Sequence, residues 1–394
     1  MSIKIKEGEI YGLPTDPRRL EAMLPTFCVQ NHASNIMPLK NGDILSVWFS
    51  GTQEGIPDIS IYMSRLNKGQ SEWTSPVKLS DDPTRSEQNP LLFPAPGGKL
   101  WLLYTAQMSG NQDTAIVRYR ISEDDGYSWG PTQNLFDTPG IFIRQPIVVL
   151  DNGSWLVPIF YCKTMPGEKW VGDYDYSAVK ISDDQGKTWS EYEVPNSTGC
   201  VHMNVEKVSN GALLALFRSR WADRIYMSRS TDNGKTWIEP VPTELPNNNS
   251  SIQFTRLSNG HLALVFNNIN ADNCKERRTS LYDDIEENDV NNNSAIEDPQ
   301  TTDHKKAFWG APRAPMTIAI SEDEGNTWRY IKDLEIGDGY CMTNNSKQKL
   351  NREYSYPSIK QTPDQKIHIT FTYFRRWIKY VCVTEDWIRN EQLI

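Results

Sequence analysis

The sequence has no run of basic residues, and its formal net charge is -9. Nucleic acid is therefore not expected as a partner, because nucleic-acid binding needs a basic patch or stripe. No stretch approaches the roughly 20 apolar residues that a membrane-spanning helix requires. The first residues, MSIKIKEGEIYGLPTDPRR, lack the apolar centre of a signal peptide. We expect no membrane partner and a cytoplasmic location, with a secreted mature form as the alternative.

Cysteine and histidine are both scarce. The six cysteines are scattered without a C-x-x-C pair or metal-like spacing, so we expect free thiols, no metal site and no cofactor. Of the five histidines, His261 and His368 fall in strand-like segments, where packing roles are expected. His304 falls in a polar segment and is expected to be solvated. His32 and His202 remain as candidates for a functional site.

Turn-forming and aromatic residues are plentiful, with 24 Gly, 24 Pro, 13 Trp and 17 Tyr, and long helical heptads are absent. This composition is typical of many short strands joined by turns. One motif, Ser-x-Asp-x-Gly-x-(Ser/Thr)-Trp, begins at Ser122, Ser182, Ser230 and Ser321. A degenerate copy begins at Ser64. A repeat of about 50 residues is the size of one four-stranded propeller blade.

Each motif follows a β-like run, and its residues suit a hairpin turn. The Asp accepts hydrogen bonds from turn amides, the Gly adopts a positive φ, and the Trp packs into the blade. We expect each motif to join the third and fourth strands of a blade. Strand pairs along the chain predict an all-β fold, a six-bladed β-propeller with four-stranded antiparallel blades, and an N-terminal strand could complete the sixth blade. Residues 1–394 are expected to form a single domain.

The long spacing before the last motif contains a polar, acidic and Asn-rich insertion at about 272–307, in the fifth blade. Such a composition is typical of a solvated or disordered loop. A lid over a functional site is the alternative.

The repeated motifs resemble the Asp-box (BNR) repeats of the sialidase superfamily. The resemblance implies a six-bladed propeller with a site at its axis. There, three arginines clamp a substrate carboxylate, a tyrosine paired with a glutamate is the nucleophile, and an aspartate is the acid/base. The segments NGALLALFRSR, APRAPMTIAISEDEGNTW and EYSYPSIKQTPDQ match the family at Arg218, Arg313 and Tyr356. A bound structural calcium ion is compatible with such propellers.

Three positions depart from the family pattern. His32 in NHASNIMPLKNG stands where the first clamp arginine is expected, and Asn89 in SEQNPLLF stands where the acid/base aspartate is expected. His202 in GCVHMNVEKVSNG stands where the glutamate partner of the tyrosine is expected. Asn cannot exchange a proton, so ordinary sialic-acid hydrolysis is disfavoured.

The remaining set suits β-elimination at a uronate, with an acidic oligosaccharide or polysaccharide as the substrate. Arginine would neutralise the carboxylate, histidine would act as base and tyrosine as acid. This chemistry is similar to that of propeller polysaccharide lyases that act on ulvan and on rhamnose–glucuronate linkages. Two alternatives stay open: an exo-sialidase or other glycoside hydrolase of the superfamily, and a glycan-binding propeller without catalysis.

Further candidates come from their positions at strand ends or in loops. We expect Arg144, Tyr161 and Glu54 to bind substrate beside Arg218, Arg313 and Asn89. Asp58, Asn249 and Gln253 are also candidates, whereas Trp48 is expected to pack between blades. In the segments REYSYP and TYFRRW, the candidates are Arg352, Glu353, Tyr373, Arg375 and Arg376. For the last segment, a solvated basic turn is an equal alternative.

Overall fold

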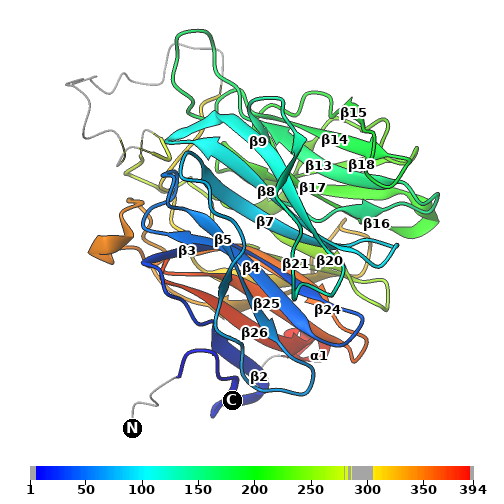
Figure 1. Cartoon of the computed structure of the whole chain (residues 1–394), viewed down its shortest axis with the longest axis vertical. Coiled ribbons are helices and arrows are strands. Elements are labelled where there is room, and N and C mark those ends of the chain that lie inside the picture. Colours follow the sequence, from blue (N-terminus) through cyan, green and yellow to red (C-terminus); the bar gives the residue numbers. More distant parts are fainter. Residues whose placement is uncertain (1–5, 279, 283–284, 286–304, 391–394) are drawn as a thin grey trace.

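The computed structural model describes residues 6–278, 280–282, 285 and 305–390. It contains six antiparallel sheets, and in five of them four strands follow one another in chain order or its reverse. This is the expected all-β, six-bladed propeller (Figure 1). Within the ranges just given, no helix is long and apolar enough to cross a membrane.

The first three blades use consecutive segments of chain. Blade I contains β3 (Gln30–Pro38), β4 (Ile44–Gly51), β5 (Ser60–Leu66) and β6 (Val77–Lys78). Blade II contains β7 (Ser86–Pro94), β8 (Leu100–Met108), β9 (Asn111–Ser122) and β10 (Gln133–Phe136). Blade III contains β11 (Ile141–Phe142), β12 (Val148–Val149), β13 (Trp155–Tyr161), β14 (Tyr176–Ser182) and β15 (Ser190–Glu193). The innermost strand of blade III is interrupted, since β11 and β12 both pair with β13.

Blades IV to VI continue the ring. Blade IV contains β16 (Cys200–Lys207), β17 (Leu213–Ser219), β18 (Arg224–Ser230) and β19 (Val241–Pro246). Blade V contains β20 (Gln253–Arg256), β21 (Leu262–Asn267), β22 (Met316–Ser321) and β23 (Tyr330–Glu335). Blade VI contains β24 (Tyr354–Gln361), β25 (Lys366–Tyr373), β26 (Trp377–Thr384), β2 (Asp16–Met23) and β1 (Tyr11–Leu13).

The N-terminal strand closes the ring as expected. In Figure 1 the blue β2 lies beside the red β26, and the two strands pair from Leu20 opposite Cys382 to Met23 opposite Lys379. A short helix, α1 (Glu385–Arg389), follows β26 directly. Trp387 of α1 donates from Nε1 to Asp16 Oδ2 at 2.5 Å, which ties both ends of the described chain to one blade. Radial closure of this kind leaves only short sheet edges, at the outer strand of each blade.

The repeated motifs form the turns that the sequence predicts. Each lies between the third and fourth strands of its blade, as between β14 and β15. There, Asp184 Oδ1 accepts from the Lys187 and Thr188 amides, and Gly186 has a φ of 89°. Ser182 Oγ accepts from the Gly186 amide at 2.7 Å. The function of these Asp residues is therefore structural: they satisfy turn amides that would otherwise lack partners.

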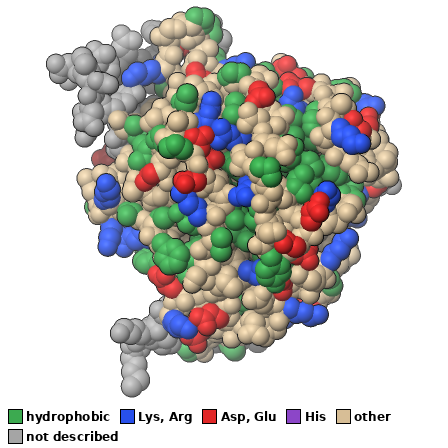
Figure 2. Space-filling model, viewed as in Figure 1, with side chains coloured by type: hydrophobic (Ala, Val, Ile, Leu, Met, Phe, Trp, Pro, Cys, Tyr) green, Lys and Arg blue, Asp and Glu red, His purple; other side chains and the backbone are tan. Residues whose placement is uncertain are grey.

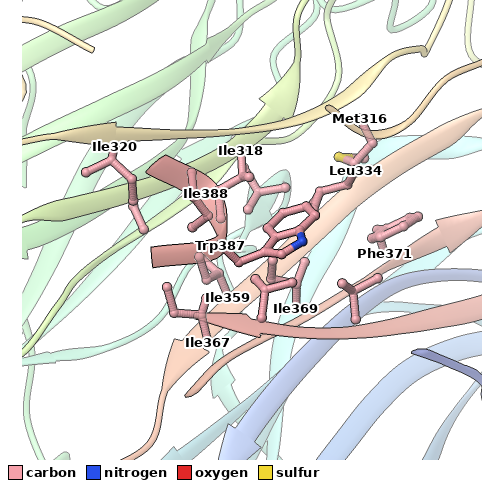
Figure 3. Close-up of a cluster of buried hydrophobic side chains, with 14 of the residues drawn as sticks. Met316, Ile318, Ile320, Leu334, Ile359, Ile367, Ile369, Phe371, Trp387 and Ile388 are labelled. Atoms are coloured by element: carbon pink, nitrogen blue, oxygen red, sulfur yellow. The ribbon is translucent and has the colours of Figure 1, made fainter. Parts of the chain in front are cut away.

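Apolar side chains fill the spaces between neighbouring blades, so the core is divided into several clusters. Figure 3 shows the cluster between blades V and VI, where Trp387 packs among Ile318, Leu334, Ile359 and Ile369. Trp48 belongs to another cluster, with residues of blades VI and I, and therefore has the packing role expected of it. On the face in Figure 2, acidic and basic side chains are interspersed rather than segregated.

Polar side chains link the innermost strands near the axis. Asn35 Oδ1 accepts from the Leu92 amide at 2.9 Å, and Asn204 Oδ1 accepts from the Phe254 amide at 2.7 Å. Gln253 Oε1 accepts from the Ile359 amide at 2.7 Å. Each bond joins one blade to the next. These three buried side-chain oxygens thus have partners, and their bonds hold neighbouring innermost strands together.

Candidate active site

Four innermost strands carry the same irregularity near their N-terminal ends. The pairing register shifts between His32 and Asn35, Gln88 and Leu91, Val201 and Asn204, and Ser355 and Ser358. Each shift contains one residue other than glycine with a positive φ: Ala33 (57°), Asn89 (51°), His202 (51°) and Tyr356 (53°). Such bulges redirect side chains, and left-handed residues of this kind concentrate at functional sites.

Tyr356 lies at the centre of a buried cluster. Its hydroxyl accepts a hydrogen bond from Arg218 Nη1 at 2.6 Å. Its ring centroid lies 4.2 Å from that of His32 and 5.6 Å from that of His202. The guanidinium carbons of Arg144 and Arg313 lie 5.4 and 5.7 Å from the same ring. The structure therefore brings together the three residues expected to be catalytic and three of the arginines expected to bind substrate.

His202 is held as a neutral imidazole. Its Nε2 lies 3.3 Å from Arg218 Nη1, and its Nδ1 lies 3.0 Å from Ser251 Oγ. Because a guanidinium can only donate, Nε2 must accept, and Nδ1 then carries the proton and donates to Ser251. The pKa of His202 is lowered well below its usual value, mainly by burial and secondly by the positive charge of Arg218.

His32 approaches Tyr356 from blade I. Its Nδ1 lies 2.8 Å from Thr372 Oγ1, and its buried Nε2 has no hydrogen-bond partner among the described residues. The pKa of His32 is lowered well below its usual value, mainly by burial and secondly by the positive charge of Arg375. Both histidines are thus uncharged beside Tyr356 at neutral pH.

Two of the arginines have no carboxylate partner in the part of the chain that the structure describes. Arg144 comes from the interruption between β11 and β12, and its Nη2 donates to the carbonyls of Ser34, Tyr356 and Pro357. Its Nε and Nη1, and Nη2 of Arg218, are buried without hydrogen bonds there. Burial lowers the pKa of both arginines because the charge lacks compensation. An uncompensated buried cation is costly, so the site is suited to an anion.

Arg313 and its neighbour Arg375 do have a carboxylate partner, because both donate to Glu353. Glu353 Oε1 accepts from Arg313 Nη1 at 3.2 Å and from Arg375 Nε at 2.8 Å. Arg375 Nη1 also donates to Glu54. Burial alone would raise the pKa of Glu353, but Arg375 and Arg313 outweigh it, and the net pKa is lowered. Glu54, expected to bind substrate, is therefore a partner of Arg375 in this structure. Arg375 is 1% exposed, so the alternative of a solvated turn does not hold for this candidate residue.

Part of the insertion in blade V packs against blade II. Leu281 and Tyr282 are buried, and the Tyr282 hydroxyl accepts from Gln107 Nε2 at 3.0 Å and Gln112 Nε2 at 2.9 Å, both in blade II. Trp309 lies over Arg218, with 5.7 Å from the guanidinium carbon to the ring centroid. The insertion is thus not a solvated loop at 281–282. Its residues 286–304, and His304 among them, lie outside the described residues.

Asn89 and Tyr161, two of the remaining candidates, lie in different parts of the structure. Asn89 occupies the bulge of blade II, and its Oδ1 has no partner among the residues that the structure describes. Tyr161 lies away from the cluster, and its hydroxyl donates to Glu191 on the outer strand β15 at 2.7 Å. Tyr161, expected to bind substrate, is therefore engaged with the outer strand of blade III instead. Across the described ranges, no group of three or more His, Cys, Asp or Glu residues is arranged to hold a metal ion.

Comparison with known proteins supports the architecture. The BNR repeat-like domain family matches residues 42–369. The chain belongs to this family. The predicted membership of the sialidase superfamily is thereby confirmed. An anhydrosialidase of Macrobdella decora is 21% identical over an alignment of 301 residues, and the match covers 71% of this chain and 32% of that protein. The chain thus spans about a third of that relative's length.

Solved structures show the same fold at low identity. The Hadza microbial sialidase Hz136 is 15% identical with a TM-score of 0.67, over 92% of this chain and 67% of that one. The intramolecular trans-sialidase from Ruminococcus gnavus is 12% identical with a TM-score of 0.63, over 92% of this chain and 96% of that one. These similarities concern the fold, so the chemistry of this BNR repeat-like propeller must be argued from its own residues.

The lowered histidine pKa values lead to a testable prediction. The ring resonances of His32 and His202 should not titrate between about pH 8 and pH 5, where an ordinary histidine does. NMR spectra of the protein, assigned with His32→Gln and His202→Gln, would measure this. Because the unfolded chain would bind these protons and the folded chain would not, the free energy of unfolding should fall as pH drops below about 6.5. A midpoint near 6.5 for either ring would contradict the described geometry.

Proposed function

We propose that the protein is a carbohydrate-active enzyme that cleaves a glycosidic bond at a carboxylated sugar of the uronate type, by β-elimination. The observation that carries the proposal is the excess positive charge around Tyr356. Arg144 and Arg218 lack carboxylate partners among the described residues, and the neutral base His202 and the hydroxyl of Tyr356 both contact Arg218. A substrate carboxylate would provide the missing negative charge.

Each residue then has a defined part in the reaction. Arg218 and Arg313 neutralise the carboxylate, which makes the C5 proton more acidic. His202 Nε2 takes this proton, and the electrons of the C5–H bond form the C4–C5 double bond. The C4–O bond breaks at the same time, and the Tyr356 hydroxyl gives its proton to the leaving oxygen. For this step, Arg218 must shift from His202 to the carboxylate and so free the Nε2 lone pair.

Ordinary sialidase hydrolysis is less well supported by the same residues. Asn89 stands where the family resemblance leads us to expect the acid/base aspartate, and an amide cannot transfer a proton. The carboxylates of Glu54 and Glu353 are both engaged by Arg375, and the lowered pKa of Glu353 makes it a poor acid. Hydrolysis of an acidic glycoside remains the second candidate, because Tyr356, Arg218 and Arg313 match the family pattern and one similar solved structure is a sialidase.

A pair of assays on one sample tests the proposal. Elimination of a uronate-containing glycan such as ulvan creates a conjugated double bond, so ultraviolet absorbance should rise with time. His202→Ala should abolish this rise, because the base is removed. His368→Ala is the matched control and should keep activity, since this buried histidine contacts Thr362 and Tyr380 in blade VI.

The second assay follows release from a fluorogenic sialoside. Sialoside release without an absorbance rise would show that the protein hydrolyses an acidic glycoside, and it would contradict the proposed elimination. If the protein shows no activity in either assay, across a panel of uronate-containing glycans, the enzymatic proposal is overturned and a glycan-binding propeller is favoured.

A further inference from the structure

Blade III differs from its neighbours at the axis. Its innermost strand is interrupted, because β11 and β12 pair separately with β13. The innermost strands of blades I, II, IV and VI instead continue through a bulge, and each bulge contains one left-handed residue. The interruption in blade III contains Arg144, which is 1% exposed. Blade III thus contributes a long cationic side chain where these four blades contribute a bulge.

The side chain of Arg144 crosses the axis. Contacts between strands of neighbouring blades place the six blades around the ring in chain order, so blade III lies opposite blade VI. Arg144 Nη2 lies 3.1 and 3.2 Å from the carbonyl oxygens of Tyr356 and Pro357 in blade VI. The same nitrogen lies 3.0 Å from the carbonyl oxygen of Ser34 in blade I. One guanidinium group therefore connects three blades.

The three carbonyls belong to the bulges that present His32 and Tyr356. Tyr356 and Pro357 lie within the register shift of blade VI, and Ser34 lies within that of blade I. Tyr356 has a φ of 53°, and Ala33, between His32 and Ser34, has a φ of 57°. Such conformations are strained for residues other than glycine and persist only where the surroundings determine them. Hydrogen bonds from Arg144 provide such a constraint on both bulges at once.

Arg144 and Arg218 contact opposite ends of Tyr356. Arg218 Nη1 donates to the hydroxyl at 2.6 Å, whereas Arg144 Nη2 donates to the main-chain carbonyl. The hydroxyl is the group that transfers a proton in the proposed reaction, so Arg218 lies at the reacting end. Arg144 acts on the backbone from which the ring extends, and a shift of this backbone would move the hydroxyl with it.

We infer that Arg144 is a positioning residue, which places the side chains of Tyr356 and His32 by holding the bulges of blades VI and I together across the axis. The inference rests on the proposed function, because it assigns Tyr356 a part in catalysis. It differs from the substrate-binding role that the sequence led us to expect for Arg144. Loss of substrate binding raises KM, whereas loss of positioning lowers kcat.

Steady-state kinetics of two variants test the inference. Arg144→Met removes every donor, and it should lower kcat by about 10- to 100-fold while KM stays within about twofold of the wild-type value. Arg144→Lys should recover part of the lost kcat, because an ammonium group has three N–H donors for the three carbonyls. Arg144→Lys also keeps the buried charge. If Arg144→Met does not fold, Arg144→Lys carries the test, with kcat below that of the wild type and KM unchanged.

Arg120→Met is the matched control. Arg120 of blade II also donates to three backbone carbonyls, those of Leu79, Trp129 and Gly130, and none of these residues lies in the cluster around Tyr356. This variant should keep the wild-type kcat and KM, and thermal unfolding would show that each variant is folded. Equal losses of kcat in Arg120→Met and Arg144→Met would reduce Arg144 to a general structural role and overturn the inference. A raised KM with unchanged kcat in Arg144→Met would also overturn it.

A second measurement does not depend on activity. The His32 ring lies 4.2 Å from the Tyr356 ring, so its NMR resonances report the ring current of Tyr356. These resonances should shift in Arg144→Met and lie closer to the wild type in Arg144→Lys, while those of His368 stay unchanged. Unchanged His32 resonances in a folded Arg144→Met protein would overturn the inference. If His32 shifts but the wild type cleaves no acidic glycan, the proposed function fails and the placement of the two side chains by Arg144 stands.

Discussion

Tyr356→Phe is expected to lower kcat by about 10²- to 10⁴-fold, the range over which a positioned proton donor contributes to catalysis. The hydroxyl that Arg218 holds at 2.6 Å is lost, whereas the ring and its packing against His32 remain. The loss should therefore appear in kcat without a comparable change in stability. Steady-state kinetics would measure the change in kcat, with whichever of the two assays detects activity of the wild type.

Tyr104→Phe is the matched control for this variant. Tyr104 is fully buried in blade II, and its hydroxyl contacts Thr132 rather than the cluster. It should keep the wild-type kcat. Equal activity of Tyr356→Phe and Tyr104→Phe would remove Tyr356 from the mechanism, and near-ultraviolet circular dichroism would show that both proteins are folded.

Glu353→Gln is expected to reduce the free energy of unfolding by about 3–5 kcal/mol, the usual cost of removing one partner from a buried ion pair. Glu353 is 1% exposed and accepts from both Arg313 and Arg375. Without its charge, Glu54 would be left as the carboxylate that pairs with Arg375. Denaturant unfolding of both proteins at neutral pH would measure the difference.

The pH dependence of this difference provides an internal check. The pKa of Glu353 is lowered in the folded protein, so its contribution is present above the ordinary value of 4.5 and is lost as pH falls through the folded value. The difference in the free energy of unfolding between the wild type and Glu353→Gln should therefore become smaller at acidic pH. Glu123→Gln, at an exposed pair with Lys99, should leave the unfolding midpoint unchanged at either pH. A small gap at neutral pH would mean that water or another group already screens the two arginines.

The repeated motifs show how much of the fold is local in origin. Ser182, Asp184 and Gly186 make the hydrogen bonds and the positive φ of their turn with one another, so their spacing in the sequence was enough to predict the turn. Repetition of such turns at blade-sized intervals then predicted the propeller, and the strand left over at the N-terminus predicted its closure. Tyr356, Arg218 and Arg313 could be predicted because they lie in segments that resemble the family.

The rest of the site depended on contacts between distant blades. Arg375 and Arg376 are adjacent in the sequence, yet the positive φ of the turn buries the first beside Glu353 and leaves the second partly exposed. Tyr161 ends a strand as expected but bonds to Glu191 on the outer side. The direction of a side chain at a strand end depends on register, and a single bulge reverses it. The propeller, its turns and the residue types at the axis therefore follow from local patterns in the sequence. Which arginines have carboxylate partners depends on contacts between blades, and this could be read only from the folded chain.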